Sequence, residues 1–394
     1  MEENKDTIVE ETTEETVAET TEETVAETEK DRKKFIIPIV AIAALALIAM
    51  IAVLIVTSGK NKSDDDNNEP ATTDYVQAAK DYLNDGDYDK ACEVLVEQIN
   101  NFEENGIEDT QLAQDIVNTY VDILKGNGED VLADAILSDM ADVLPEVSSA
   151  AVVIDDGETK DGMYIYGAYP SKEVTAPYLT YSVINAQYGS DNTATVGSGR
   201  YYRLDGDKYR YFVFEKITWQ IMKNDQNGIL LLADKAIETA PYNDEYADIG
   251  WDGSTLRKFL NNDFLNMAFS EDEKNAMQTI NVIPVKNPDY GVVTGAYVDD
   301  FVTIPSIDDL VDGIYSIKEG RKDESVTRSS TATEYACAKG THLDTTGKCK
   351  WWTRTCGVKE NMGSFVGPVG IISCDGYYVN GDEIGVKPMI YIKK

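Results

Sequence analysis

Residues 200–232, RYYRLDGDKYRYFVFEKITWQIMKNDQNGILLL, decide the fold of the C-terminal part of this 394-residue chain. Runs rich in tyrosine, valine, isoleucine and leucine flank two polar stretches, DGDK at 205–208 and KNDQNG at 223–228. Aromatic and β-branched residues favour strands, and Asp-Gly and Asn-Gly favour tight turns. The stretch therefore predicts two β-hairpins, with strands over 200–204, 209–214, 217–222 and 229–232.

Helix signals follow these strands. Ser254 can cap a helix over 255–260, because its hydroxyl can accept a backbone N–H of the first turn. Ser270 and Glu273 have the spacing of a capping box, which predicts a second helix over 271–277.

The remainder of this region returns to short strands. A third helix is expected near Ser306, and Gly-rich sequence with β-forming residues fills 320–394. Strands, then helices, then strands are typical of an α+β domain. We place this domain at 163–394, after a linker at 147–162.

Residues 73–146 have the spacing of amphipathic helices. Apolar side chains recur at intervals of three and four residues in four stretches. They are Tyr75, Ala78, Ala79 and Tyr82; Tyr88, Ala91, Cys92, Leu95 and Ile99; Ala113, Ile116, Val117, Tyr120 and Leu124; and Ala133, Ile136, Leu137, Met140 and Leu144. This region is predicted to be an all-α stalk of two helix-turn-helix pairs.

An apolar run, FIIPIVAIAALALIAMIAVLIV at 35–56, contains no charged residue. As a helix it would be about 33 Å long, enough to cross a hydrocarbon core of about 30 Å. The run is longer than the apolar part of a cleaved signal peptide and lies too far from the N-terminus. The sequence therefore predicts a single-pass transmembrane helix.

The residues around this run predict its orientation. The basic cluster KDRKK at 30–34 marks the cytoplasmic side. Residues 1–34, which contain the octapeptide ETTEETVA twice, have too few apolar side chains to fold and are predicted to be a disordered acidic tail. A polar linker follows at 57–72, and the rest of the chain is expected outside the cell.

The C-terminal domain carries several motifs in a distinctive order. They are YGAYPSKEV, ITWQIM with ILLLADKAI, WDGSTLRKFLNNDFLNMAFSEDEK at 251–274, TATEYA, WWTRTCG and GVKPMIYI. Together they resemble a family of uncharacterised bacterial surface domains, classed as a domain of unknown function, and the likeness covers 163–394. Where that family has arginine in its final motif, this chain has Lys387, which cannot form a bidentate ion pair.

Two further likenesses concern the fold. The order of TATEYA, WWTRT and the final strand is similar to C-type-lectin-like modules, including the formylglycine-generating relatives. That similarity implies that a strand at 164–169 lies close to the last strand, at 388–393. Residues 73–107 resemble a tetratricopeptide repeat in their small and aromatic positions. A shared fold does not transfer a function.

Four cysteines lie in the last domain, Cys337, Cys349, Cys356 and Cys374. An even number in a region expected to face the oxidising exterior predicts two disulfides. The pairing Cys337–Cys349 with Cys356–Cys374 is favoured among the three that are possible. Free thiols, or a redox or copper-binding pair, are the alternatives, and the spacing lacks the C-x-x-C pairs of a zinc site.

Aromatic and cationic residues of the motifs are candidates for a binding site. Trp251, Trp352 and Tyr378 could line a sugar or peptide site, with Arg257 and Arg354 orienting polar groups. The alternative is that they pack the interior, with each tryptophan buried and each arginine paired to a carboxylate.

Charge and missing motifs limit the function. The formal net charge of −36 and the acidic stalk would repel nucleic acid. The single histidine, His342, and the lack of a phosphate-binding glycine loop or a G-x-S-x-G motif predict no catalytic centre, cofactor or metal. The sequence favours a membrane-anchored, non-catalytic module that binds a cell-wall glycan or a protein. An enzyme of the lectin-like fold, oxidative or hydrolytic, is the alternative.

Overall fold

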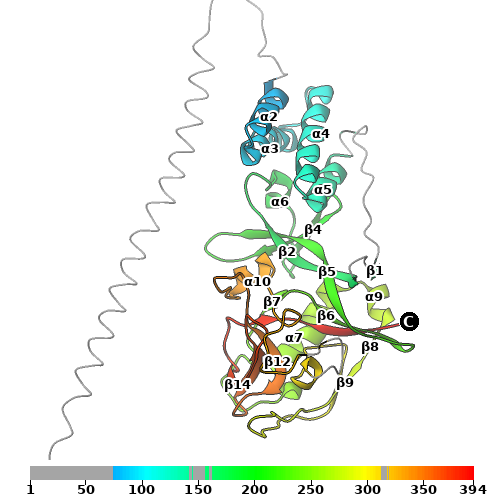
Figure 1. Cartoon of the computed structure of the whole chain (residues 1–394). Coiled ribbons are helices and arrows are strands. Elements are labelled where there is room, and N and C mark those ends of the chain that lie inside the picture. The colour runs from blue at the N-terminus through cyan, green and yellow to red at the C-terminus, as the bar shows by residue number, and fades with distance from the viewer. Residues whose placement is uncertain (1–73, 142–143, 145–155, 159–161, 312–316, 318) are drawn as a thin grey trace, which may run out of the picture. The chain divides into compact units, whose positions relative to one another are not determined.

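The computed structural model describes residues 74–141, 144, 156–158, 162–311, 317 and 319–394 (Figure 1). The chain divides into two compact units, 1–71 and 72–394. Because the description begins at residue 74, the predicted tail, apolar run and polar linker lie outside the described residues. Their cellular location stays a prediction.

The predicted fold needs a correction concerning the membrane. Within the described residues, no helix is both long enough and apolar enough to cross a bilayer. The fold as described thus lacks the single-pass helix that the sequence predicted, whose residues, 35–56, are not among those described.

The N-terminal part of the second unit contains the four predicted helices (Figure 1). They are α2 (Asp74–Asn84), α3 (Tyr88–Asn105), α4 (Thr110–Gly126) and α5 (Asp130–Met140). Asp87 and Asp109 cap α3 and α4, because each side chain accepts a backbone N–H of the first turn. The apolar faces predicted from the spacing are buried in α3, α4 and α5, except that Tyr88 at the start of α3 is exposed.

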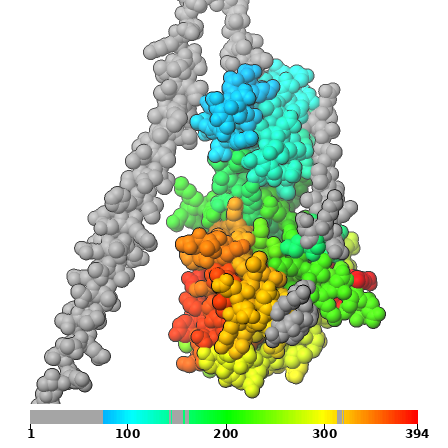
Figure 2. All heavy atoms as spheres, viewed as in Figure 1, coloured from blue at the N-terminus to red at the C-terminus, as the bar shows by residue number. Residues whose placement is uncertain are grey.

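These helices do not form a separate all-α stalk, so that prediction is wrong. Their core also contains residues of α6 (Tyr181–Asn185) and of the strands that follow. The added members are Val174, Val183, Tyr201, Tyr211 and Val213. The helices therefore form a layer on the strand region, and Figure 2 shows the cyan helices in contact with the green strands.

The larger sheet has nine strands. Six follow the order β1-β2-β5-β6-β16-β11; in addition, β4 pairs with β5, β3 pairs with β4, and β8 pairs with β16. Their bounds are β1 (Gly157–Glu158), β2 (Met163–Val174), β3 (Thr193–Val196), β4 (Gly199–Leu204), β5 (Arg210–Asn224), β6 (Gly228–Ala233), β8 (Met277–Gln278), β11 (Val302–Thr303) and β16 (Met389–Lys393). The predicted hairpins β4–β5 and β5–β6 are confirmed. One long strand, β5, replaces the two strands that were expected between the turns.

A five-stranded sheet, ordered β14-β13-β12-β15-β7, completes the α+β region. Its strands are β7 (Glu238–Thr239), β12 (Trp351–Cys356), β13 (Met362–Val366), β14 (Ile372–Tyr378) and β15 (Gly385–Val386), and β9 (Ile280–Val282) pairs separately with β10 (Val298–Asp300). The helices are α7 (Thr255–Phe259), a π-helical turn (Leu260–Phe264), α8 (Leu265–Ala268), α9 (Glu271–Ala276) and α10 (Glu334–Lys339). The predicted Ser254 cap and the Ser270–Glu273 capping box are both present. Near Ser306, only one short turn, Asp308–Leu310, is described.

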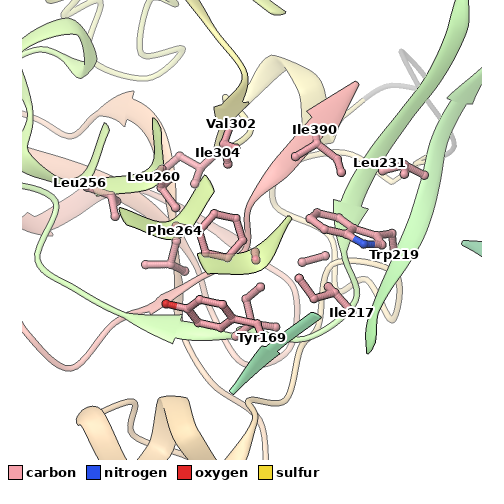
Figure 3. Close-up of a cluster of buried hydrophobic side chains, with 14 of the residues drawn as sticks. Tyr169, Ile217, Trp219, Leu231, Leu256, Leu260, Phe264, Val302, Ile304 and Ile390 are labelled. Atoms are coloured by element: carbon pink, nitrogen blue, oxygen red, sulfur yellow. The ribbon is translucent and has the colours of Figure 1, made fainter. Parts of the chain in front are cut away.

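The core of the α+β region lies between the larger sheet and the helical segment 255–268 (Figure 3). Trp219 of β5 and Ile390 of β16 face Phe264 and Leu260 across it. The final strand β16 lies in the same sheet as β2, but β5 and β6 separate the two. The strands that the lectin-like resemblance placed close together, β2 and β16, therefore share a sheet but do not pair directly.

Candidate functional site

Trp352 and Arg354, the central candidates from the sequence, both lie on β12 and point into the interior. Trp352 is 0% exposed, and its indole N–H donates to the carbonyl oxygen of Ala240 at 3.1 Å. Arg354 donates from Nη1 to Asp309 Oδ2 at 2.6 Å and to the carbonyl oxygen of Ile304 at 2.9 Å. These contacts are those of residues that pack a domain.

Trp251 and Arg257 are joined by one buried carboxylate. Asp300 accepts the Trp251 indole N–H on Oδ2 at 2.8 Å and the Arg257 Nε–H on Oδ1 at 2.7 Å. Arg257 also donates to the carbonyl oxygen of Asp252 at 3.2 Å. The motif WDGSTLR is therefore held to β10 by its aromatic and its cationic residue.

Tyr378 differs from the other four candidates because it is 52% exposed. Its ring meets that of Tyr246, also exposed, edge-on at 5.5 Å between centroids. The pair lies on the surface, where Tyr378 ends β14 and Tyr246 belongs to the loop before Trp251.

The predicted disulfides are absent, which corrects the sequence analysis. All five cysteines are free thiols, and only Cys337 is partly accessible. Burial raises the pKa of the Cys349 thiol to about 12 and that of Cys356 to about 11. Buried and protonated thiols are poor nucleophiles, so these cysteines act as small apolar side chains.

Lys387, which stands where the resembled family has arginine, is fully buried. Its ammonium lies 4.9 Å from the centroid of the Trp351 ring and has no hydrogen-bond partner among the described residues. Burial lowers the pKa of Lys387 to about 8. The side chain therefore makes a cation–π contact in place of an ion pair.

A cleft with a volume of about 810 Å³ lies elsewhere, over the paired strands β2 and β5. Its floor consists of small or flat side chains of these strands, Ile165, Ala168, Pro170, Phe214 and Thr218. One wall comes from α5 and the turn before β4, and the other from residues 234–237 and Thr333. None of the five predicted binding residues lines it.

The β3–β4 turn, which forms part of one wall of the cleft, contacts α5. Gly197 in this turn has φ +55°, and a Cβ there would lie 2.4 Å from the carbonyl oxygen of Ala135. Ser198 donates its hydroxyl to the carbonyl oxygen of Asp134 at 3.1 Å. Only glycine allows so close an approach with this backbone. The turn is thus fixed on the helix layer, and β4 leaves β5 at Arg200.

Arg200 closes the end of the cleft at β4. Its guanidinium lies 4.2 Å from the centroid of the Phe214 ring, and Nη1 donates to the carbonyl oxygen of Met267 at 2.8 Å. Burial lowers the pKa of Arg200. No carboxylate of the described residues lies within ion-pair distance of it.

A cation–carboxylate group crosses the floor of the cleft. Lys216 donates to Asp156 at 2.8 Å and lies 3.9 Å from Glu273. Burial raises the pKa of Asp156. It acts in the same direction on Glu273, but hydrogen bonds with Ser270 and Asp156 and the charge of Lys216 together lower the pKa of Glu273. The oxygens of Glu273 accept the backbone N–H groups of Gly167 and Ser270. The group therefore links the residue before β1 to β5, and α9 to β2.

A buried polar chain begins behind the cleft. Tyr169, whose ring is drawn in Figure 3, donates its hydroxyl to Glu238 at 2.7 Å. Lys339 contacts the other oxygen of Glu238 at 2.7 Å. Glu238 is fully buried, so the two partners neutralise a carboxylate that would otherwise be costly. Among the described residues, no group of three or more His, Cys, Asp or Glu side chains is arranged to hold a metal ion.

Sequence reasoning missed this cleft. Its position depends on the contact between Gly197 and α5, which joins segments more than fifty residues apart. The signal in the sequence was VGSGR, at 196–200, in which Gly197 and Ser198 form the two-residue turn of the β3–β4 hairpin.

Residues 226–394 match a protein family described as a domain of unknown function, DUF6273. The match supports the resemblance to an uncharacterised domain over the later part of the range first expected. It shows no similarity to C-type-lectin-like modules or to tetratricopeptide repeats. No curated protein and no solved structure matches the chain. The β4–β5 side of the cleft precedes the matched residues.

Proposed function

We propose that residues 74–394 form a non-catalytic binding module for a protein ligand, and that the ligand occupies the cleft over β2 and β5. The observation that carries this proposal is the cleft itself. About 810 Å³ is within the range of ligand sites, and both apolar and charged side chains line it.

Of the two ligand classes that the sequence left open, the cleft favours protein over glycan. A sugar ring is usually bound against an exposed aromatic face. The aromatic rings that line the cleft are Tyr169 and Phe214, both of which are buried, and Arg200 covers Phe214. A mixed lining of small apolar and charged groups is instead suited to a polypeptide.

The experiment compares the full chain with a variant whose cleft is filled. Ala168 lies half-buried on the cleft floor, so Ala168→Trp should block the cleft, and Ser171→Trp offers a second blocked variant. The matched control is Val326→Trp, because Val326 is 91% exposed and lies elsewhere. Each protein is probed with a random array of linear peptides and with a glycan array.

We expect a set of peptides to bind the wild-type chain and Val326→Trp but neither blocked variant. Thermal melting of each protein checks that the variants are folded. If only glycans show this cleft dependence, the ligand class is wrong. If no probe distinguishes the wild-type chain from the blocked variants, the proposed function is wrong.

A further inference from the structure

The strand β5 has an unpaired edge inside the cleft. β4 pairs with β5 only over Arg210–Val213, and β6 pairs with it only from Trp219 onward. On the side opposite β2, Thr218 is bonded to Asp234, and residues 214–217 have no neighbouring strand in the described part of the chain. A strand edge in this state presents free backbone donors and acceptors.

The direction of these backbone groups follows from one hydrogen bond. The carbonyl oxygen of Thr218 accepts the N–H of Asp234 at 2.9 Å, so the polar groups of Thr218 point away from β2. In an antiparallel strand, alternate residues point their N–H and C=O to the same side. The register shifts beside 214–218 come from extra residues on β2, which leaves β5 regular there. Phe214 and Lys216 therefore point their backbone groups into the cleft.

A second observation concerns the charge of the cleft. Three of its four carboxylates already have partners: Asp134 with Lys125, Asp156 with Lys216, and Asp234 with Gln220. Arg200 and Lys235 line the same cleft, and neither has a carboxylate partner within the described ranges. Glu215 and Asp234 also line the cleft without a cationic partner among the described residues, so the lining as a whole is not cationic. Arg200, at the β4 end, can nevertheless take one carboxylate of a ligand.

We propose that the cleft binds an extended peptide segment of a partner protein that carries an acidic residue, and that this segment adds to β5 as a short strand at residues 214–217. The segment would exchange backbone hydrogen bonds with Phe214 and Lys216 and place a carboxylate against Arg200. Only a polypeptide repeats N–H and C=O groups at the spacing of a strand, about 3.3 Å per residue. This inference rests on the proposed function and specifies how the ligand is bound.

The walls limit the length of the added strand. β4 and the residues at the end of β6 occupy the same side of β5 at either end of the gap, so about four residues, or about 13 Å, can pair before the segment must leave through the mouth of the cleft. A chain end or the tip of a loop fits this limit better than a long strand.

The experiment selects random linear eight-residue peptides on the full chain and removes those that also bind Ala168→Trp. Selected peptides are then resynthesised with single N-methyl groups, each of which removes one backbone donor. We expect methylation at alternate positions to weaken binding about five- to tenfold, since a net hydrogen bond is worth about 1 kcal/mol. Methylation at the positions between them should have little effect.

Arg200 provides the test of charge. Arg200→Gln should weaken binding of acidic peptides and remove the preference for them, and Arg200→Lys should retain part of it. The control is Lys322→Gln, because Lys322 is an exposed cation outside the cleft. Equal affinity of wild-type protein and Arg200→Gln would overturn the role of Arg200.

Each remaining outcome distinguishes the inference from the proposed function. Peptides that bind in the cleft but tolerate methylation at every position would overturn strand addition and leave the proposed function standing. The absence of any cleft-dependent peptide would overturn both. Binding that appears only after residues 145–155 are replaced by a Gly-Ser linker would identify this segment of the same chain as the occupant. Self-association that Ala168→Trp abolishes would identify a second copy.

Discussion

Arg257 donates its Nε–H to Asp300 at 2.7 Å, and this ion pair joins the helix α7 to the strand β10. Asp300 is 1% exposed, so its charge depends on the partners that the fold provides. The carboxylate also accepts the indole N–H of Trp251. A single aspartate therefore holds two of the residues that the sequence suggested for ligand binding, and their geometry is that of a structural link.

Asp300→Ala should lower the free energy of unfolding by about 3–5 kcal/mol, because it leaves a guanidinium and an indole N–H without their acceptor. Urea denaturation measures this change. Lys223→Ala is the control: it breaks an exposed pair with Asp225 and should cost about 0–1 kcal/mol. Similar losses in the two variants would contradict the structural role of Asp300.

Trp352→Ala should also lower the free energy of unfolding by about 3–5 kcal/mol, since it empties a buried site and removes the bond to Ala240. Tyr378→Ala should change it by no more than about 0.5 kcal/mol, because the ring is half-exposed. Denaturant titration of both variants checks the contrast. A Trp352→Ala protein with wild-type stability would show that the indole does not pack the core.

The local features of this fold could be predicted from the sequence. The Ser254 cap, the Ser270–Glu273 box and the two hairpin turns each depend on residues within a few positions of one another. The docking of the helix layer could not be predicted, because the helices bury the same apolar spacing whether they stand alone or pack on Val213. The sequence also could not decide whether the candidate tryptophans and arginines pack the core or line a site, because these residues give the same sequence signal in both places.

The cysteines show the same limit. Their even number and expected location suggested disulfides, but pairing depends on side-chain geometry that spacing does not determine. In the structure, Cys356 and Cys374 lie on different strands, β12 and β14, with β13 between them.

Alkylation in denaturant without reducing agent should therefore add five labels per chain, one for each cysteine. In the native protein, Cys337 should react first, since it alone is partly accessible. Mass spectrometry of the labelled chain measures both results. Only one label in the denatured, unreduced chain would indicate two disulfides and contradict the structure.

Lys387 should make stability depend on pH in the alkaline range. Burial lowers its pKa to about 8 in the folded protein, from 10.5 as the ordinary value for lysine. Below pH 8 the side chain is protonated in both states. Between about pH 8 and 10.5 an unfolded chain keeps the proton that the buried Lys387 has lost, so the contribution of Lys387 to stability should rise with pH.

The comparison with Lys387→Met isolates this effect, because tyrosines and cysteines titrate in the same range in both proteins. Asp234, Cys349 and Lys348 are the titratable neighbours that act on Lys387. The difference in unfolding free energy, wild type minus variant, should be constant below pH 8 and should increase above it. A difference that does not change with pH would show that the ammonium is not desolvated.

Gly197→Ala should both destabilise the chain and alter the cleft. The added Cβ would lie 2.4 Å from the carbonyl oxygen of Ala135, so the β3–β4 turn must move away from α5. Overpacking of this kind typically costs about 1–3 kcal/mol, and the positive φ adds about 1 kcal/mol. Gly347→Ala is the matched control, because Gly347 also has a positive φ, +75°, but a Cβ there meets nothing within 4 Å.

The two variants separate the strain of the backbone from the loss of the helix contact. Both variants should lose stability because alanine is strained at a positive φ. Only Gly197→Ala should lose further stability, because its turn must also move away from α5. Since β4 pairs with β5 only from Tyr201 onward, release of the turn from α5 should let Gly199 and Arg200 of β4 approach residues 214–217. Amide hydrogen exchange at Phe214 and Lys216 should then become slower in Gly197→Ala than in Gly347→Ala, although the first protein is the less stable. Faster or unchanged exchange at these two amides would show that the helix layer does not keep the edge of β5 open.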